Sequence, residues 1–247
     1  MNSFYEGTYT VNSREIDGQN RCRLSALLGY LQEAATTHAC LLHVSREETL
    51  AKYNSFWMLA RIWCRLDRPL LWNETFTVRT SYREGRGASF YRDFDLFVGG
   101  KPVGEAVSVW VLADLNTRKL LRMSKVLEFS QVEGERSAKD KILSRIHLPE
   151  GMAGVDCRRL YYSDTDVNGH VNNTRYADFA CDALRLETLD ASRFVSELQL
   201  DYTAECRPGE EITMLAGERD GLTYVQGVDP EGKPRFGAAL GYGTAAE

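Results

Sequence analysis

The sequence has no cluster of cysteines. Its six cysteines are scattered over 247 residues without a close pair, so we expect neither a zinc ribbon nor a disulfide framework. We interpret them as reduced thiols in a cytosol-like compartment. They are Cys22, Cys40, Cys64, Cys157, Cys181 and Cys206.

Long apolar runs are missing too. The longest strongly apolar stretch, Val107 to Leu112, contains Ser108 and is far shorter than the roughly 20 residues of a membrane helix. The first twenty residues have no apolar core of signal-peptide length and carry three acids, unlike a secretory or import leader. The sequence therefore predicts no membrane span and a cytoplasmic location.

Basic residues are in slight deficit. Lys and Arg number 30 against 35 Asp and Glu, and the net charge of −5 argues against a general binder of nucleic acid or anionic membranes. One stretch differs, because Asn116 to His147 has eight basic and four acidic residues, which gives +4. This stretch is either a solvated connector, the simpler interpretation, or a docking strip for an acidic partner.

Hydrophobic periodicity predicts one helix followed by a strand meander, twice. Apolar residues recur every three or four positions from Leu24 to Val44, as on a helix with one buried face. Alternating patterns then indicate half-buried strands. The expected strands cover 61–67, 76–82, 90–98 and 103–112 in the first half, and the second half has a helix at 173–189 and strands at 194–202, 211–216, 222–228 and 235–242.

Specific residues also align between the halves. Asp17–Leu31 matches Asp166–Ala180 at an offset of 149 (166 − 17), and the Gly-Lys-Pro run at Gly100 matches the one at Gly232 at an offset of 132 (232 − 100). We therefore predict two copies of one unit, each a helix packed on an antiparallel sheet.

The densest group of reactive side chains lies just before the second helix, at 161–173. Asp166, Asn168 and His170 alternate there, so an extended chain would place them on one side. The free N–H groups of the following helix form a ready site for an oxyanion. Glu205 and Cys206 stand at an expected strand end, 35 residues after His170 (205 − 170).

The run from Asp164 to Tyr176, DTDVNGHVNNTRY, with Glu205-Cys206 at that distance, closely resembles the acyl-acyl carrier protein (acyl-ACP) thioesterases of plants and bacteria. The first helix, with LQEAA and His38, resembles their N-terminal half. The resemblance implies an α+β tandem hotdog fold. Its parts would be an N-terminal, acyl-binding hotdog at 1–123, a basic-biased linker at 124–150 and a C-terminal, catalytic hotdog at 151–247.

The resemblance also implies the site and the reaction, which is hydrolysis of the thioester between a fatty acyl chain and the phosphopantetheine arm of ACP, in fatty acid biosynthesis. Without the plant leader and anchor, a bacterial-type soluble form is expected. No cofactor and no metal are required. The implied catalytic residues are Asp166, Asn168, His170 and Glu205, with Cys206 as a further candidate and the backbone N–H groups of Val171, Asn172 and Asn173 as oxyanion donors.

The first copy has Gln19 and Arg21 where the second has Asn168 and His170, so we expect one active site per chain, in the second copy. The nearest alternative is a hotdog thioesterase acting on acyl-CoA, and a less favoured one is a non-catalytic sensor of acyl thioesters. The expected partner is ACP and not nucleic acid. Acyl chain preference and oligomeric state, monomer or homodimer, stay open.

Overall fold

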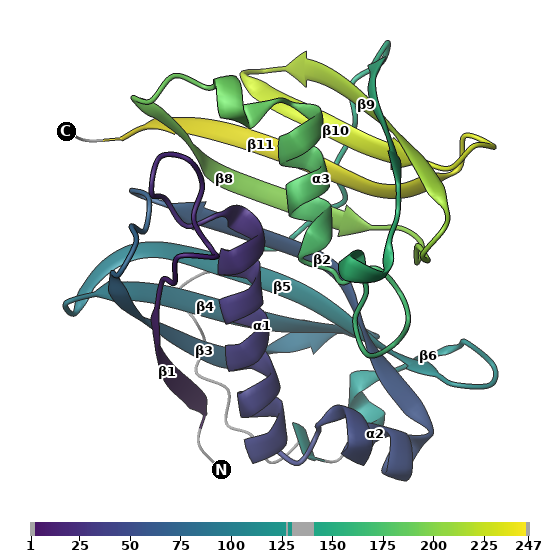
Figure 1. Ribbon diagram of the computed structural model, residues 1–247. Helices are drawn as coiled ribbons and strands as arrows, with labels where there is room; N and C mark the ends of the chain where they lie inside the picture. Colours follow the sequence, from purple (N-terminus) through teal and green to yellow (C-terminus); the bar gives the residue numbers. More distant parts are fainter. Residues whose placement is uncertain (1–2, 127, 130–140, 246–247) are drawn as a thin grey trace. The chain divides into compact units, whose positions relative to one another are not determined.

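The structure is a computed structural model that describes residues 3–126, 128–129 and 141–245 (Figure 1). The predicted linker at 124–150 lies partly outside these residues. The chain divides into two compact units, which we call unit 1 and unit 2. Unit 1 comprises Met1–Thr10, Gly29–Ile62 and Glu74–Leu143, and unit 2 comprises Val11–Leu28, Trp63–Asn73 and Ser144–Glu247.

Unit 1 holds an antiparallel sheet and most of the longest helix. The strands β1, β3, β4 and β5 pair in that order as antiparallel neighbours, and β2 follows β5. The elements are β1 (Phe4–Thr10), α1 (Leu24–Leu41), α2 (Arg46–Tyr53), β2 (Ser55–Leu66), β3 (Thr75–Arg86), β4 (Ser89–Val98), β5 (Lys101–Asp114) and β6 (Leu120–Leu121).

Helix α1 buries the apolar face that its periodicity predicts. Leu31 and Ala34 are fully buried, and the Tyr30 ring meets the Phe76 ring of β3 edge to face with centroids 5.1 Å apart. The helix ends at Leu41, before the predicted end at Val44. His43 takes a left-handed conformation (φ 57°), and the N–H of Val44 returns to the Ala39 carbonyl at 2.9 Å, which closes the helix.

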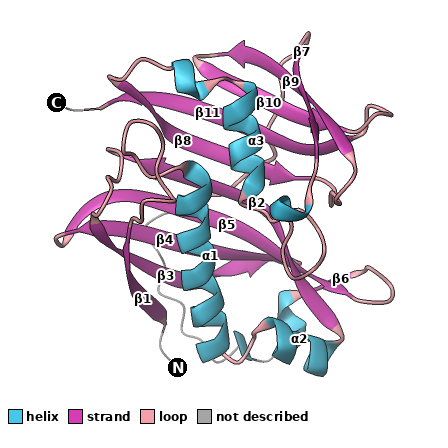
Figure 2. Ribbon diagram, in the orientation of Figure 1, coloured by secondary structure: helices cyan, strands magenta, loops and turns pink. Residues whose placement is uncertain are grey.

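Unit 2 repeats the arrangement (Figure 2). Its antiparallel strands lie in the order β8, β11, β10, β9, β7, and α3 contacts β9, β10 and β11. The Tyr176 ring of α3 packs edge to face on Phe236 at 5.1 Å. The elements are β7 (Ala153–Arg159), α3 (Arg175–Ala183), β8 (Arg193–Tyr202), β9 (Glu211–Arg219), β10 (Leu222–Val228) and β11 (Pro234–Thr244).

This architecture confirms the predicted fold class: an α+β protein in which the hotdog arrangement of helix and antiparallel sheet occurs twice along the chain. The predicted helix at 173–189 is too long, because Arg185 adopts a left-handed conformation (φ 52°) that ends α3 early. Strands β1, β6 and β7 and helix α2 were not predicted from the sequence. Within the described ranges, no helix is long and apolar enough to cross a membrane.

Candidate active site

The reactive residues before α3 form a tight turn, not an extended strand. We call Asp164–Asn173 the site loop. Thr165 and Val171 pair as an isolated antiparallel bridge, and the Asp166 N–H donates to the His170 carbonyl at 3.0 Å. Gly169 occupies the left-handed region (φ 73°) that the turn requires. The expected alternation of Asp166, Asn168 and His170 on one side of a strand is therefore wrong.

Asp166 holds the turn closed. Its Oδ1 accepts the Asn168 N–H at 2.8 Å, and its carbonyl accepts the Gly169 N–H at 3.0 Å. A carboxylate bonded to the N–H two residues later is the usual support of such turns. Asn168 is exposed, so the turn presents the Asn168 amide side chain to solvent.

The structure brings His170 and Glu205 together. His170 Nε2 lies 3.3 Å from Glu205 Oε2, and their side chains are 24% and 38% exposed. Glu205 belongs to residues 203–209 between β8 and β9, which we call the base segment. The Val171 N–H donates to the Cys206 carbonyl at 2.9 Å and so ties the site loop to the base segment. The contact between His170 and Glu205 joins residues that the spacing of 35 positions (205 − 170) and the family resemblance had both brought into consideration.

Cys206 is placed differently from its neighbour Glu205. Its side chain is fully buried, and burial is the main cause that raises the pKa of its thiol. The Tyr176 hydroxyl hydrogen-bonds with the Cys206 thiol and lowers that pKa in part. A buried neutral thiol is a poor nucleophile, because the thiolate is the attacking species.

Two of the three N–H groups expected as oxyanion donors are already used. The Val171 N–H donates to Cys206, and the Asn172 N–H donates to the Asp164 carbonyl at 2.8 Å. Within the described part of the chain, the Asn173 N–H has no protein acceptor. The Asn172 side chain supports the turn just before α3 instead, since its Oδ1 accepts the Thr174 N–H at 2.9 Å.

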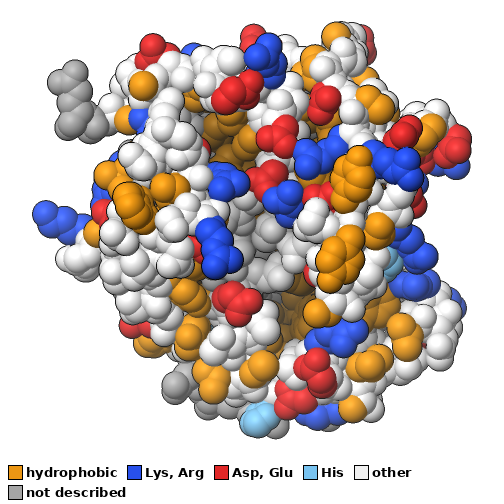
Figure 3. Space-filling model, viewed as in Figure 1, with side chains coloured by type: hydrophobic (Ala, Val, Ile, Leu, Met, Phe, Trp, Pro, Cys, Tyr) orange, Lys and Arg blue, Asp and Glu red, His pale blue; other side chains and the backbone are white. Residues whose placement is uncertain are grey.

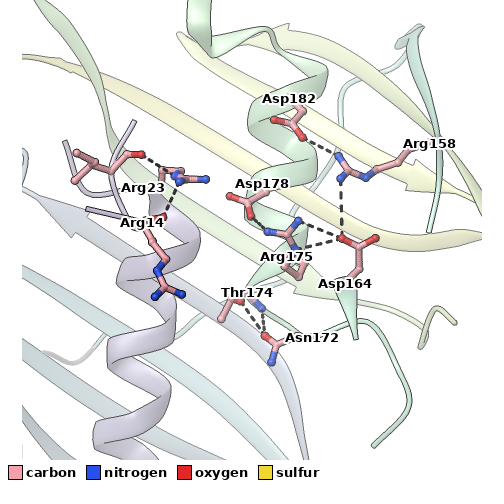
Figure 4. A network of polar contacts seen from close by, with 10 residues as sticks. Arg14, Arg23, Arg158, Asp164, Asn172, Thr174, Arg175, Asp178 and Asp182 are labelled. Atoms are coloured by element: carbon pink, nitrogen blue, oxygen red, sulfur yellow. Dashed lines mark hydrogen bonds and ion pairs between the residues drawn. The ribbon is translucent and has the colours of Figure 1, made fainter. Parts of the chain in front are cut away.

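A buried carboxylate that the sequence analysis missed anchors the site loop. Asp164 is 2% exposed and accepts two hydrogen bonds from Arg175, at 3.1 and 3.3 Å, while Arg158 lies 4.0 Å away (Figure 4). Arg175 also pairs with Asp178, and Arg158 pairs with Asp182 at 2.7 Å. The three-residue spacing of Arg175 and Asp178 on the predicted helix was the sequence signal for the ion pair between these two residues.

The first copy has a similar loop with different side chains. Arg21, which aligns with His170, donates to the carbonyl oxygens of Arg193, at 2.7 Å, and Ala191. Gln19, which aligns with Asn168, donates to the Leu189 carbonyl at 3.4 Å. Both side chains thus make structural contacts to backbone.

No group of three or more His, Cys, Asp or Glu side chains that would suit a metal ion occurs among residues 3–126, 128–129 and 141–245. The pair of His170 and Glu205 instead supplies an imidazole and a carboxylate within reach of one water molecule. Such a pair can remove a proton from water and deliver it to a leaving group. General acid-base hydrolysis is therefore the chemistry that this site suits.

Family models match both halves of the chain. The acyl-ACP thioesterase N-terminal domain matches residues 2–128, and the acyl-ACP thioesterase C-terminal domain matches residues 157–229. The second match contains the site loop and the base segment.

Relatives agree with the family models. A palmitoyl-acyl carrier protein thioesterase of Gossypium hirsutum is 28% identical over 235 residues, covering 89% of this chain and 56% of the relative. An oleoyl-acyl carrier protein thioesterase of Arabidopsis thaliana is 25% identical over 231 residues, covering 85% and 63%. The chain thus spans little more than half the length of the curated relatives it matches.

Solved structures share the fold. An acyl-ACP thioesterase from Bacteroides thetaiotaomicron superposes with a TM-score of 0.87 at 23% identity, over 98% of both chains. The 12:0-ACP thioesterase from Umbellularia californica superposes with a TM-score of 0.86 at 20% identity, over 99% of this chain and 98% of the other. These likenesses show the fold, and the two domain matches show that the chain belongs to the acyl-ACP thioesterase family.

Proposed function

We propose that this protein hydrolyses the thioester of fatty acyl-ACP and releases a free fatty acid in fatty acid biosynthesis. The observation that carries the proposal is the contact of 3.3 Å between His170 and Glu205, inside the match to the family's C-terminal domain. The names of the relatives in cotton and Arabidopsis support the same substrate class.

In the proposed reaction, a water molecule attacks the thioester carbon while Glu205 accepts its proton. Asn168 and His170 position the water and the carbonyl, and the Asn173 N–H contributes to stabilising the oxyanion. The carbon-sulfur bond then breaks as the carbonyl re-forms, and the proton passes through His170 to the pantetheine sulfur. The products are a fatty acid and the free thiol of ACP. Asp166 acts by keeping the turn closed.

Water attack is favoured over an acyl-enzyme on Cys206. A cysteine nucleophile needs a lowered pKa and a base within reach, whereas burial raises the pKa of this thiol. The substrate is already a thioester, so transfer to cysteine would exchange one thioester for another of similar reactivity. Cys206 therefore acts through packing beside Tyr176.

The proposed macromolecular partner is ACP, which carries the phosphopantetheine arm. Five basic side chains of the +4 stretch are exposed within the described residues and are available to an acidic carrier: Arg118, Lys119, Arg122, Lys125 and Arg145. The rest of that stretch lies partly outside the described residues. On the face seen in Figure 3, basic and acidic side chains lie beside one another, so we expect docking to depend on a local group of charges.

The six unpaired cysteines support a reducing, cytosol-like compartment.

Hydrolysis rates with matched acyl-ACP and acyl-CoA test the proposal. We expect kcat/KM to be higher for acyl-ACP, and Glu205→Ala to abolish most turnover of both substrates. Glu218→Ala, a change of a carboxylate on β9 outside the site loop and the base segment, is the matched control. Faster hydrolysis of acyl-CoA would favour the CoA-specific alternative, and tight binding of both thioesters without turnover would indicate a sensor.

A further inference from the structure

The base segment has no regular secondary structure, yet it carries the residue that we assign as base. Two consecutive carbonyl groups of the base segment accept hydrogen bonds, one from a residue earlier in the chain and one from a residue later in the chain. The Cys206 carbonyl accepts the Val171 N–H at 2.9 Å, and the Glu205 carbonyl accepts a hydrogen bond from Arg235 Nη1 at 2.9 Å. The second bond attaches Glu205 itself to strand β11.

The Arg235 backbone also forms hydrogen bonds with the first residues of the base segment. Its carbonyl accepts the N–H groups of Thr203 at 2.9 Å and Ala204 at 3.1 Å. Side chain and main chain of one residue thus contact three consecutive residues, Thr203 to Glu205. The Arg235 side chain is 22% exposed, so solvent screens its charge only in part.

The orientation of the Arg235 side chain is set by Asp229. Its Nη2 lies 3.2 Å from Asp229 Oδ2, and the Asp229 side chain is 5% exposed. The other carboxylate oxygen, Oδ1, accepts the N–H groups of Glu231 at 3.0 Å and Lys233 at 2.8 Å in the turn between β10 and β11. The Lys233 N–H is the largest cause that lowers the pKa of Asp229, which keeps the carboxylate charged opposite the guanidinium.

We propose that Arg235, oriented by Asp229, is a positioning residue that fixes Glu205 for the reaction. This inference rests on the proposed function. Arginine suits the role because its planar fork donates in two fixed directions at once, to the Asp229 carboxylate and to the Glu205 carbonyl. A lysine has a single nitrogen and cannot reproduce both bonds in that geometry.

Steady-state kinetics of variants give the first test. We expect Arg235→Met to lower kcat about 10- to 100-fold with KM changed less than about threefold, because displacements near 1 Å at a reacting group have effects of this order. Arg235→Lys should recover little of the loss. Asp229→Asn keeps an Oδ1 acceptor for the turn while removing the charge that orients the guanidinium, so it should cause a smaller loss of the same kind.

Arg219→Met is the matched control. Arg219 also donates from its side chain to backbone carbonyl groups, those of His147 and Leu148, but it lies on β9 outside the base segment. We expect its kcat to stay within about twofold of the unaltered protein. A kcat loss in Arg219→Met equal to that in Arg235→Met would assign the effect to general destabilisation and overturn the proposal.

A double-mutant cycle separates positioning from structure. If Arg235 acts through Glu205, adding Arg235→Met to Glu205→Ala should lower kcat less than about twofold further, whereas independent effects would multiply. Additive losses would contradict the proposal.

Amide hydrogen exchange gives a readout that needs no turnover. Loss of the Arg235 bond should speed exchange of the Val171 N–H, whose acceptor is Cys206, by about tenfold or more, because the segment opens more often. Unchanged exchange and unchanged kcat would overturn the proposal. If the unaltered protein hydrolyses no acyl thioester, the proposed function fails, and the exchange rates alone decide whether Arg235 holds the segment.

Discussion

The loop of the first copy, Ile16–Cys22, and the site loop share their backbone hydrogen bonds but not their chemistry. The Asp17 N–H donates to the Arg21 carbonyl at 2.8 Å, as the Asp166 N–H does to His170 at 3.0 Å. Ile16 and Cys22 pair as Thr165 and Val171 do. The Gln19 N–H donates to Asp17 Oδ1 at 2.8 Å, as the Asn168 N–H does to Asp166.

The segment opposite each loop corresponds as well. The Cys22 N–H donates to the Leu70 carbonyl at 2.8 Å, and the Val171 N–H donates to Cys206 at 2.9 Å, at an offset of 136 (206 − 70). The residue before Leu70 is Pro69, whereas the residue before Cys206 is Glu205. The shared aspartate therefore supports the turn, and we attribute the proposed difference in function to three substituted positions: Gln19 against Asn168, Arg21 against His170 and Pro69 against Glu205.

The largest expected effect comes from removing a side chain at one of the positions where the second copy differs from the first. Glu205→Ala and His170→Ala should each lower kcat by about 10² to 10⁴, the usual contribution of a general acid or base. Arg21→Ala, at the matching place in the first copy, should lower kcat less than about threefold, since Arg21 contacts only backbone carbonyl groups in the described chain. Single-turnover rates with acyl-ACP check both. Full activity of His170→Ala, or equal losses at Arg21 and His170, would show that the first loop shares the chemistry.

Removing the aspartate that both loops share should lower the stability of the protein in either copy but its activity in the second copy only. Asp17→Ala and Asp166→Ala each break hydrogen bonds between carboxylate and backbone and should each lower Tm by about 2 to 4 °C. Only Asp166→Ala should also lower kcat, by roughly tenfold, because only its loop carries His170. Thermal unfolding and kinetics on the same preparations test this. A kcat loss in Asp17→Ala as large as that in Asp166→Ala would contradict the division of roles.

Neighbouring residues of the base segment should behave differently too. Cys206→Ala should lower kcat less than about tenfold, because the thiol is buried and burial raises its pKa. Iodoacetamide at neutral pH should modify the exposed Cys40 and Cys157 well before Cys206. An acyl group found on Cys206 by mass spectrometry of quenched turnover, with Glu205→Ala still active, would replace water attack by covalent catalysis.

The sequence predicted the repeated elements better than the loops between them. Sequence patterns located β4, β8 and β10 to within one residue at each end and β5 to within two. Apolar stretches bounded by turn residues mark such strands even where burial does not strictly alternate. The expected alternation misjudged the site loop, where left-handed Gly169 and the Asp166 carboxylate close a turn that periodicity cannot reveal. The contact of His170 with Glu205 depends on the pairing of Val171 with Cys206, a tertiary hydrogen bond. The sequence placed the two residues near each other only through the expected topology and the family resemblance, and neither gave that bond.

The smallest expected effect concerns the exposed basic residues that follow the last long strand of the first copy. After strand β5 they are Arg118, Lys119, Arg122 and Lys125. If this group binds the acidic carrier, KM for acyl-ACP should rise severalfold between about 50 and 500 mM salt, while KM for a short acyl-pantetheine stays flat.

The double variant Arg118→Glu, Lys119→Glu should raise KM for acyl-ACP at low salt and flatten its salt response. Its kcat should be unchanged, because exposed charges guide the encounter and do not take part in the reaction. The matched control reverses charge on unit 2, at Arg185, an exposed residue near α3. Equal salt response of both substrates, or an equal effect of Arg185→Glu, would remove the basic group from the account of docking and leave the carrier to be recognised through its pantetheine arm.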